Sequence, residues 1–107
     1  MKSGDVWIVD IPELGTHEQS GIRPAVILAR VAKTVVTIIP FTSNQLALRF
    51  PFTHLINPTK DNGLAVPSVA LIFHLRAIDV SYLQKRIGIL DRKTLTDIRK
   101  KARQLVG

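Results

Sequence analysis

Short apolar runs separated by turn residues make up most of the chain. Runs rich in Val and Ile and bounded by Gly, Pro, Asn or Asp are typical of β-strands. We predict strands at Asp5–Asp10, Ala25–Ala29, Thr34–Ile39, Phe50–Ile56 and Ser68–Phe73, with a short closing strand at Arg86–Ile89. In the first strand Trp7 and Val9 share one face and Val6 and Ile8 the other, so both faces are expected to be partly buried.

Prolines and short polar residues set the expected ends of these strands. Pro24 is placed at the first residue of the second strand, because a residue without an N–H cannot donate to a ladder. Pro40 is expected to end the third strand, before a polar loop over 41–45. The segment 74–79 either continues the fifth strand or follows it after a bend. Ser81 is predicted to cap a single helical turn.

The periodicity changes near the end of the chain and predicts one helix, Arg92–Val106, capped by Asp91. Its apolar residues fall on one stripe, formed by Leu95, Ile98, Ala102 and Leu105. Its other faces are basic, which favours a solvated surface, or alternatively a contact with RNA or an acidic peptide.

Five to seven short strands followed by one helix predict a mainly β fold (α+β), arranged as a small, partly open barrel or as two packed sheets. We expect a single domain over 1–107. A chain of this length buries only a modest core, so dimerisation would stabilise it.

Composition narrows the function. The net charge of +7 favours a polyanionic or acidic partner. Cysteine is absent, which removes disulfides and thiol chemistry and is typical of a cytoplasmic protein. No apolar run reaches 18 residues, and the first ten residues lack the apolar core of an export signal, so we expect neither a membrane span nor export.

The segment 15–29 combines a polar loop with a rigid strand. Arg23 lies between the two, and Pro24 biases it towards an extended conformation. A permanent cation is therefore held on a firm scaffold, one loop away from His17 and Glu18. Thr42 and Ser43 follow the third strand, so the ends of these strands are candidates to meet at one mouth of a barrel.

Other kinds of site find little support. The three histidines, His17, His54 and His74, are far apart and lack a second ligand at metal-binding spacing, so no metal or other cofactor is expected. Neither a phosphate-binding glycine loop nor a nucleophile elbow is present. Cleavage of RNA without a metal needs proton transfer at the 2′-hydroxyl and the leaving oxygen, together with cations near the phosphate. Arg, His and hydroxyl side chains suit that chemistry, although any basic domain contains them.

Four blocks of the sequence, in order, resemble the MazF/PemK (Kid-like) family of toxin endoribonucleases. They are Gly4–Trp7, His17–Val26, Ile39–Ser43 and Gly63–Asp79. The combination of GDVW with the later EQSGIRP is specific, whereas either motif alone is weak. The similarity covers nearly the whole chain.

The resemblance implies an SH3-like barrel with a C-terminal helix that forms homodimers. It implies a toxin of a type II toxin–antitoxin system that cleaves single-stranded RNA, commonly messenger RNA, without a metal and is held inactive by an antitoxin protein. The family's essential arginine falls on Arg23, its hydroxyl residue on Thr42, and the loop histidine of some members on His17. The RNA-contacting positions are expected at Glu18, Gln19, Ser43, His54, His74 and Arg76.

The chain departs from the family pattern in one strand. The arginine and aspartate that Kid-like members use there fall on Leu71 and Phe73, which cannot perform that chemistry. Either catalysis rests on Arg23 and Thr42, or His74 takes over acid–base work. Two other functions remain open: an SH3-like module that binds nucleic acid or protein without cleaving, and a structural subunit whose basic helix docks an acidic partner.

Overall fold

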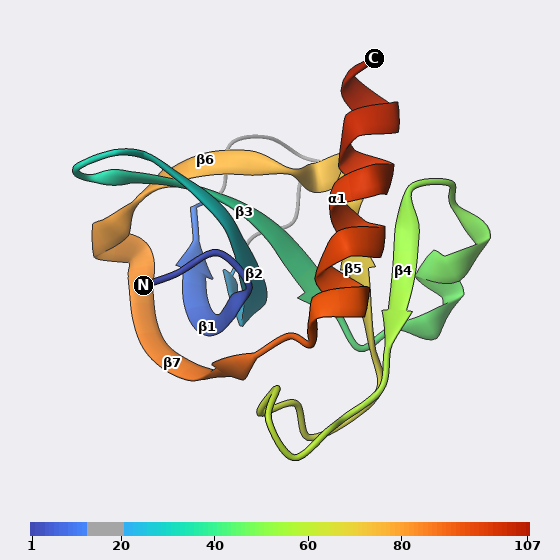
Figure 1. Ribbon diagram of the computed structural model, residues 1–107. Helices are drawn as coiled ribbons and strands as arrows, with labels where there is room; N and C mark the ends of the chain where they lie inside the picture. The colour runs from blue at the N-terminus through green and yellow to red at the C-terminus, as the bar shows by residue number, and fades with distance from the viewer. Residues whose placement is uncertain (13–20) are drawn as a thin grey trace.

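The computed structural model describes residues 1–12 and 21–107. In these residues a curled sheet is packed against one helix (Figure 1). The strands are β1 (Asp5–Ile11), β2 (Gly21–Ala32), β3 (Val35–Thr42), β4 (Thr53–Ile56), β5 (Ser68–Leu71), β6 (Arg76–Asp79) and β7 (Leu83–Ile89). The helices are the 3-10 turns η1 (Gln45–Arg49), η2 (Ile72–His74) and η3 (Val80–Tyr82), followed by α1 (Arg92–Val106). The expected class, mainly β with a C-terminal helix, is confirmed.

The sheet is antiparallel and open. Its order is β4-β5-β3-β2-β1-β7, and β6 pairs with β3 beside this path. Among the described residues β4 and β7 end this path, and β6 is a third strand with a single partner. The curled sheet forms a partly open barrel, one of the two arrangements that the strand pattern predicts (Figure 1). The strands β2 and β3 are joined by a two-residue turn, which an antiparallel pair permits.

The strand β3 changes partners at Pro40. Up to Pro40 it pairs with β2, and its first half also pairs with β6. Beyond Pro40 it pairs with β5, through Phe41 and Thr42. The prediction that Pro40 ends the strand was wrong, because a residue without an N–H is tolerated where the ladder passes from one partner to the next.

The second strand is also longer than predicted, because β2 begins at Gly21 and not at Pro24. Pro24 lies opposite Ile8 of β1, and the pairing of β2 with β3 begins one residue later, at Ala25. At Pro24 the strand is thus paired on one side only, which is where proline is accepted.

The two faces of the sheet bury two separate clusters. One contains Val9, Ile27 and Ile38, with Trp7 packed against it. The other contains Val26, Ile39 and Phe41, together with residues of α1. Successive residues of a strand point to opposite faces, so the continuous apolar runs of β2 and β3 fill both clusters. Burial on both faces of the first strand is confirmed, since Val6 and Val9 belong to different clusters.

The helix α1 has the predicted bounds and cap. The Asp91 side chain accepts a hydrogen bond from the Thr94 N–H at 3.1 Å. Ile98 and Ala102 are buried, and Leu95 and Leu105 pack against the same cluster, which confirms the predicted stripe. No helix of residues 1–12 and 21–107 combines the length and the apolar character that a membrane crossing requires.

The segment after β3 differs from the prediction. Of the loop expected over 41–45, the first two residues belong to β3 and the last one begins η1. The strand expected over 50–56 begins only at Thr53. Asn44 starts η1 by accepting a hydrogen bond from the Leu46 N–H at 3.1 Å. Phe52 has a φ of 58°, a left-handed conformation that is incompatible with a strand.

The region after β5 is a sharp bend followed by two strands. The predicted fifth strand ends at Leu71, and η2 turns the chain into β6. The helical turn that follows is capped by Asp79, whose carboxylate accepts from the Ser81 N–H at 2.8 Å, so the assignment of the cap to Ser81 was wrong. The closing strand β7 is longer than predicted and begins at Leu83.

Candidate active site

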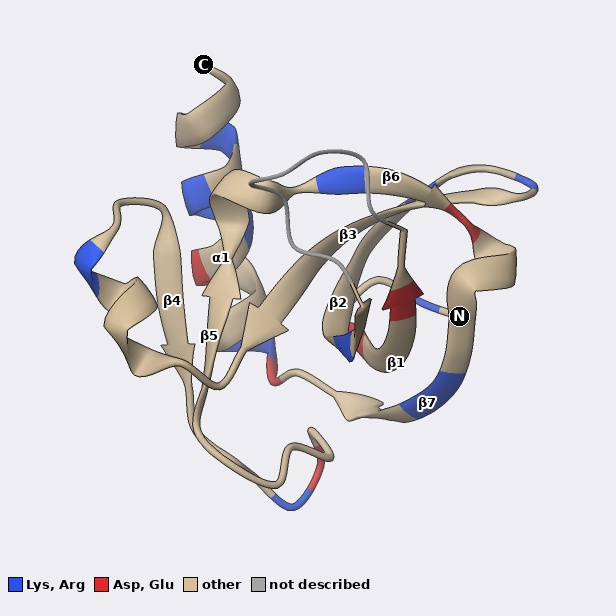
Figure 2. Ribbon diagram, turned by 180° about the vertical axis from the view of Figure 1, so that it is seen from behind, with Lys and Arg blue, Asp and Glu red and all other residues tan. Residues whose placement is uncertain are grey.

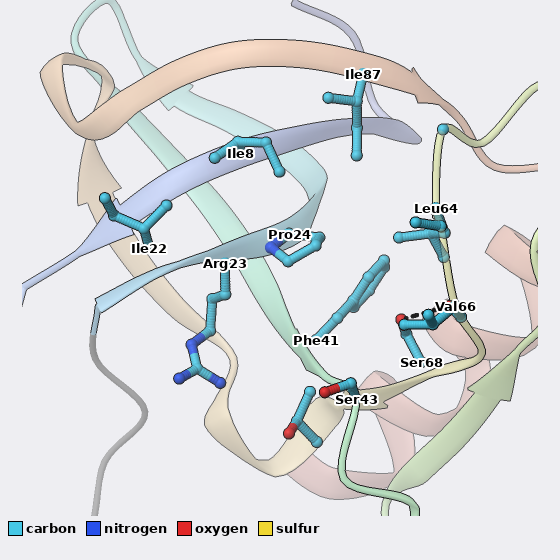
Figure 3. Close-up of a pocket in the computed structure, with 13 residues that line it drawn as sticks. Ile8, Ile22, Arg23, Pro24, Phe41, Ser43, Leu64, Val66, Ser68 and Ile87 are labelled. Carbon is cyan, nitrogen blue, oxygen red and sulfur yellow. Dashed lines mark hydrogen bonds between the residues drawn. The ribbon is translucent and has the colours of Figure 1, made fainter.

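A cavity of about 460 Å³ lies at the meeting point of β2, the end of β3, the loop before β5, and β7 (Figure 3). We call it the first cavity. Its polar lining side chains are Arg23, Thr42, Ser43 and Ser68. Its apolar lining includes Ile8, Pro24, Phe41, Leu64 and Ile87. Phe41 and Leu64 also belong to the buried core, so the cavity has a rigid floor.

Arg23 is positioned by the strand β2. Its Cα lies opposite Val9 of β1, directly before the proline that marks where β2 separates from β3. In Figure 3 its guanidinium points to the side of the cavity where Ser43 lies. Burial lowers the pKa of Arg23 below its usual value, yet an arginine remains charged at neutral pH. The partly buried cation is therefore screened less by solvent than a fully exposed arginine is.

Thr42 and Ser43 are placed by the end of β3. Thr42 pairs with Val69 of β5, which fixes its backbone. Its hydroxyl oxygen accepts a hydrogen bond from the Asn44 N–H at 3.2 Å. A hydroxyl that accepts in this way keeps its own proton for donation. Thr42 is thus arranged as a hydrogen-bond donor on the rim of the first cavity.

The wall opposite Arg23 is formed by the loop 57–67, which is held from within by Asn62. Asn62 is 2% exposed, and its side-chain oxygen accepts from the N–H groups of Thr59 and Leu64 at 3.1 and 3.0 Å. Its side-chain nitrogen donates to the Asn57 carbonyl at 3.0 Å. The dashed line in Figure 3 is the bond from the Ser68 hydroxyl to the Val66 carbonyl, at 3.1 Å. These bonds make the wall a preformed surface.

A second cavity of about 350 Å³ adjoins the first. Thr42 lines both of them. The remaining lining residues of the second cavity are Asn44, Leu46, Ala47, Arg49, Phe50, Leu71, Phe73 and His74. The structure thus brings Arg23, Thr42 and Ser43 together in one cavity and places His74 in the next.

Two of the residues expected to contact RNA line neither cavity. The ring of His54 lies against α1, where its Nδ1 is 3.0 Å from the Lys101 ammonium nitrogen. Arg76 donates from its Nη1 to the Pro12 carbonyl at 3.0 Å, and so holds the end of β1 against β6. His17, Glu18 and Gln19 lie outside the described residues.

Sequence reasoning did not single out several lining residues. Ser68 and Leu64 reach the first cavity from a distant part of the chain, and Phe50 and Phe73 meet in the second. The sequence Asp61-Asn62-Gly63 is typical of a tight turn, but it does not indicate which strand the loop contacts. Such neighbours depend on tertiary pairing.

The described residues offer no ligand set for a metal ion. No group of three His, Cys, Asp or Glu side chains among them is close enough to hold one. The chemistry available in the first cavity is that of a cation and hydroxyl donors. This combination suits a substrate with a phosphate group, whose negative oxygens accept from both.

Comparisons with known proteins agree with this chemistry. The family model described as "PemK-like, MazF-like toxin of type II toxin-antitoxin system" matches residues 2–106. Endoribonuclease MazF9 of Mycobacterium tuberculosis is 30% identical over 107 residues, covering 92% of this chain and 89% of that protein.

Solved structures give the same result. The crystal structure of MazF (Form-I) from Deinococcus radiodurans has a TM-score of 0.81 and 29% identity, covering 100% of this chain and 96% of that one. The MazE–MazF structure (Form-II) from Deinococcus radiodurans has a TM-score of 0.68 and 26% identity, covering 98% and 93%. By the family model and by these relatives, the chain belongs to the family of PemK-like, MazF-like toxins of type II toxin–antitoxin systems.

Proposed function

We propose that this protein is the toxin of a type II toxin–antitoxin pair and acts as a sequence-specific endoribonuclease on single-stranded RNA, chiefly messenger RNA, so that it stops translation. The observation that carries the proposal is the convergence of Arg23, Thr42 and Ser43 on one cavity. Family membership supports it, because relatives such as MazF9 are named endoribonucleases. One domain, 1–107, would carry the whole activity.

The proposed reaction uses the RNA as its own nucleophile and needs no metal. The 2′-hydroxyl oxygen attacks the adjacent phosphorus and loses its proton, and the bond from phosphorus to the 5′-oxygen breaks as that oxygen gains a proton. The products are a 2′,3′-cyclic phosphate and a 5′-hydroxyl. Arg23 stabilises the charge that develops on the phosphate oxygens, and the Thr42 hydroxyl donates to one of them.

Proton transfer needs a group that titrates near neutral pH. Arg23 is always charged and so is a poor proton donor. We assign proton transfer to His17, the position on which the loop histidine of some family members falls. His74 is the alternative within the described residues, because it lines the adjoining cavity.

The proposed partners follow from charge and family. A net charge of +7 favours RNA and an acidic antitoxin, which we propose occupies the RNA-binding surface. The relative from Deinococcus radiodurans was solved as a MazE–MazF complex. We propose that the protein acts in the cytoplasm as a homodimer, an assembly that light scattering on the purified chain will test.

The decisive experiment is cleavage of mixed-sequence RNA in the presence of EDTA. We expect the wild-type chain to cut RNA but not DNA of the same sequence, because DNA lacks the 2′-hydroxyl. Arg23→Ala should reduce kcat/KM about 10²- to 10³-fold, the usual loss when a group that stabilises an oxyanion is removed. Arg23→Lys should recover only part of the rate, because lysine cannot donate two parallel bonds.

The matched control is Arg30→Ala. Arg30 is an exposed arginine of β2 that lines neither cavity, and its side chain donates hydrogen bonds to carbonyls of its own turn. Its removal should leave cleavage unchanged. RNA that is bound but stays intact with the wild-type chain would contradict the nuclease and favour a binding module.

A further inference from the structure

The second cavity is walled by aromatic rings that are open to solvent. Phe50 and Phe73 are 46% and 37% exposed, although phenylalanine is usually buried. Their ring centroids are 6.0 Å apart, with an interplanar angle of 63°. The ring of His74 lies 4.5 Å from that of Phe73. Three rings from η2 and the end of η1 thus gather around one opening.

The polar groups of this cavity suit an anionic, aromatic ligand. The guanidinium carbon of Arg49 lies 4.9 Å from the centre of the Phe50 ring. Asn44 accepts from the Leu46 N–H through its side-chain oxygen, which directs its amide NH₂ towards other acceptors. None of the described residues that line either cavity is acidic. Aromatic faces beside a cation are the usual platform for an unpaired nucleobase.

The second cavity adjoins the first at Thr42, which lines both. In RNA a phosphate and a neighbouring base are joined by a single ribose, so a strand held by its phosphate in one cavity presents a base to the next. A volume of about 350 Å³ is at the lower end of the range for small-molecule sites, roughly 300–1,000 Å³, and accommodates one base.

We propose that the second cavity is a nucleobase subsite, in which one unpaired base of the RNA stacks on Phe73 and Phe50 next to the phosphate bound at Arg23. The inference rests on the proposed function, since it names where that substrate is held. Phe73 stands where the Kid-like pattern has an aspartate. The aromatic wall of the subsite is therefore a feature of this chain and not of that pattern. Asn44 reads the edge of the stacked base and contributes to base preference.

A binding experiment without cleavage tests the subsite directly. The isotope-labelled full chain is titrated with AMP, GMP, CMP and UMP, and separately with inorganic phosphate, while the ring resonances of Phe50, Phe73 and His74 are followed by NMR. Nucleotides should shift these resonances through the ring current of the stacked base. Inorganic phosphate should not produce these shifts. Equal shifts with phosphate, or no ring shifts with any nucleotide, would overturn the proposal.

A cleavage experiment tests the same subsite in the reaction. Mixed-sequence RNA is cut in EDTA, and the new ends are sequenced. Phe73→Ala should lower kcat/KM about 5- to 150-fold, the loss expected for one stacked base, and should weaken the base preference at one position beside the cut. Phe73→Trp should preserve both. Phe50→Ala provides a second test if Phe73→Ala fails to fold.

The matched control is Tyr82→Ala. Tyr82 is an aromatic residue of η3 with 39% exposure, and it lines neither cavity. Its removal should change neither rate nor preference.

Cleavage that depends on Arg23 but not on Phe73 or Phe50 would overturn the subsite while leaving the nuclease intact. Nucleotide-induced ring shifts without any RNA cleavage would support the subsite and contradict the nuclease. Ring shifts that depend on protein concentration alone would overturn the subsite, because a second copy of the chain would then cover the rings.

Discussion

Gly63 shows how a single backbone position determines the shape of the site. Its φ is +73°, and a Cβ atom placed there would lie 2.1 Å from the Ile87 carbonyl oxygen. The loop that carries Leu64 to the first cavity therefore touches β7 through bare backbone. Side chains are excluded at this residue both by conformation and by space.

Replacing Gly63 with alanine should destabilise the protein severely. The left-handed conformation costs a non-glycine residue roughly 1–2 kcal/mol, and the backbone clash adds a cost typical of overpacking, about 1–3 kcal/mol. Gly21→Ala is the matched control, since Gly21 has a φ of +89° with nothing within 4 Å of the added Cβ. Urea denaturation should show a loss for Gly63→Ala that exceeds that of Gly21→Ala by at least about 1 kcal/mol. Equal losses would mean that the loop can move away from β7.

At the residue scale, the sequence predicted which residues carry the chemistry better than it predicted which residues contact one another. Arg23 was predictable as a rigidly held cation because Pro24 follows it, and the family pattern directed attention to Thr42. The Ser68 hydroxyl and the Phe50–Phe73 pair were not predictable, because each depends on segments far apart in the chain coming together. The same limit applies to His54, whose lysine partner lies 47 residues away.

One lysine of α1 forms hydrogen bonds to two residues of β4. Lys101 donates to the Thr53 carbonyl at 2.8 Å and lies 3.0 Å from the His54 Nδ1. A lysine can only donate, so the His54 Nδ1 must accept and the ring must be neutral. Burial, and then the charge of Lys101, lowers the pKa of His54 below its usual 6.5. Protonation of His54 removes this bond and places two cations side by side.

The stability of the protein should therefore decrease as the pH falls below the pKa of an ordinary histidine. The folded-state pKa of His54 is lower than the unfolded value of about 6.5, so its contribution is complete above pH 6.5 and is lost as the pH falls through the folded-state pKa. Thermal unfolding between about pH 7.5 and 5 should show this loss. His54→Gln, which keeps an acceptor but cannot titrate, should flatten the dependence in this range. An unchanged slope in that variant would contradict the assignment.

At the element scale, the strands and helix were predicted where one pattern dominates. The stripe and cap of α1 are local features, so its bounds were correct. The predicted bounds of β2 and β3 were wrong, because tertiary pairing decides whether Pro24 and Pro40 interrupt a ladder. The predicted start of β4 was wrong because Phe52 adopts a left-handed conformation. Local rules for proline describe a strand in isolation, whereas these prolines lie where a neighbouring strand is absent or changes.

At the scale of the whole molecule, the basic charge is spread over several elements. Figure 2 shows basic segments on α1, on β6 and on β7, on different sides of the molecule. Neither cavity is lined by a residue of α1. The charge on the helix therefore adds to the general attraction for RNA without touching the proposed path of the strand.

The salt dependence of RNA binding should separate these two contributions. For single strands the slope of log K against log salt changes by about 0.7 for each phosphate that the protein no longer neutralises. With a 2′-O-methyl RNA, which cannot be cut by its own 2′-hydroxyl, Arg23→Gln removes the cation that holds the phosphate and should reduce the slope by about that amount. The exposed pair Lys100→Gln and Arg103→Gln on α1 should leave it nearly unchanged. A reduction of about 1.4 in the double variant would show that RNA crosses the helix.

The central position of β3 has a consequence for the order in which the protein opens. This strand pairs with β2, β5 and β6 and supplies buried residues to both clusters. Spontaneous local opening begins where few such bonds must break, and here that is at the strands with a single partner, β4, β6 and β7. The amide protons of β3 will accordingly exchange with solvent more slowly than those of β4. Thr42, at the end of this strand, pairs with β5 and not with an edge strand, so the proposed catalytic hydroxyl keeps its backbone partner when β4 or β7 opens locally.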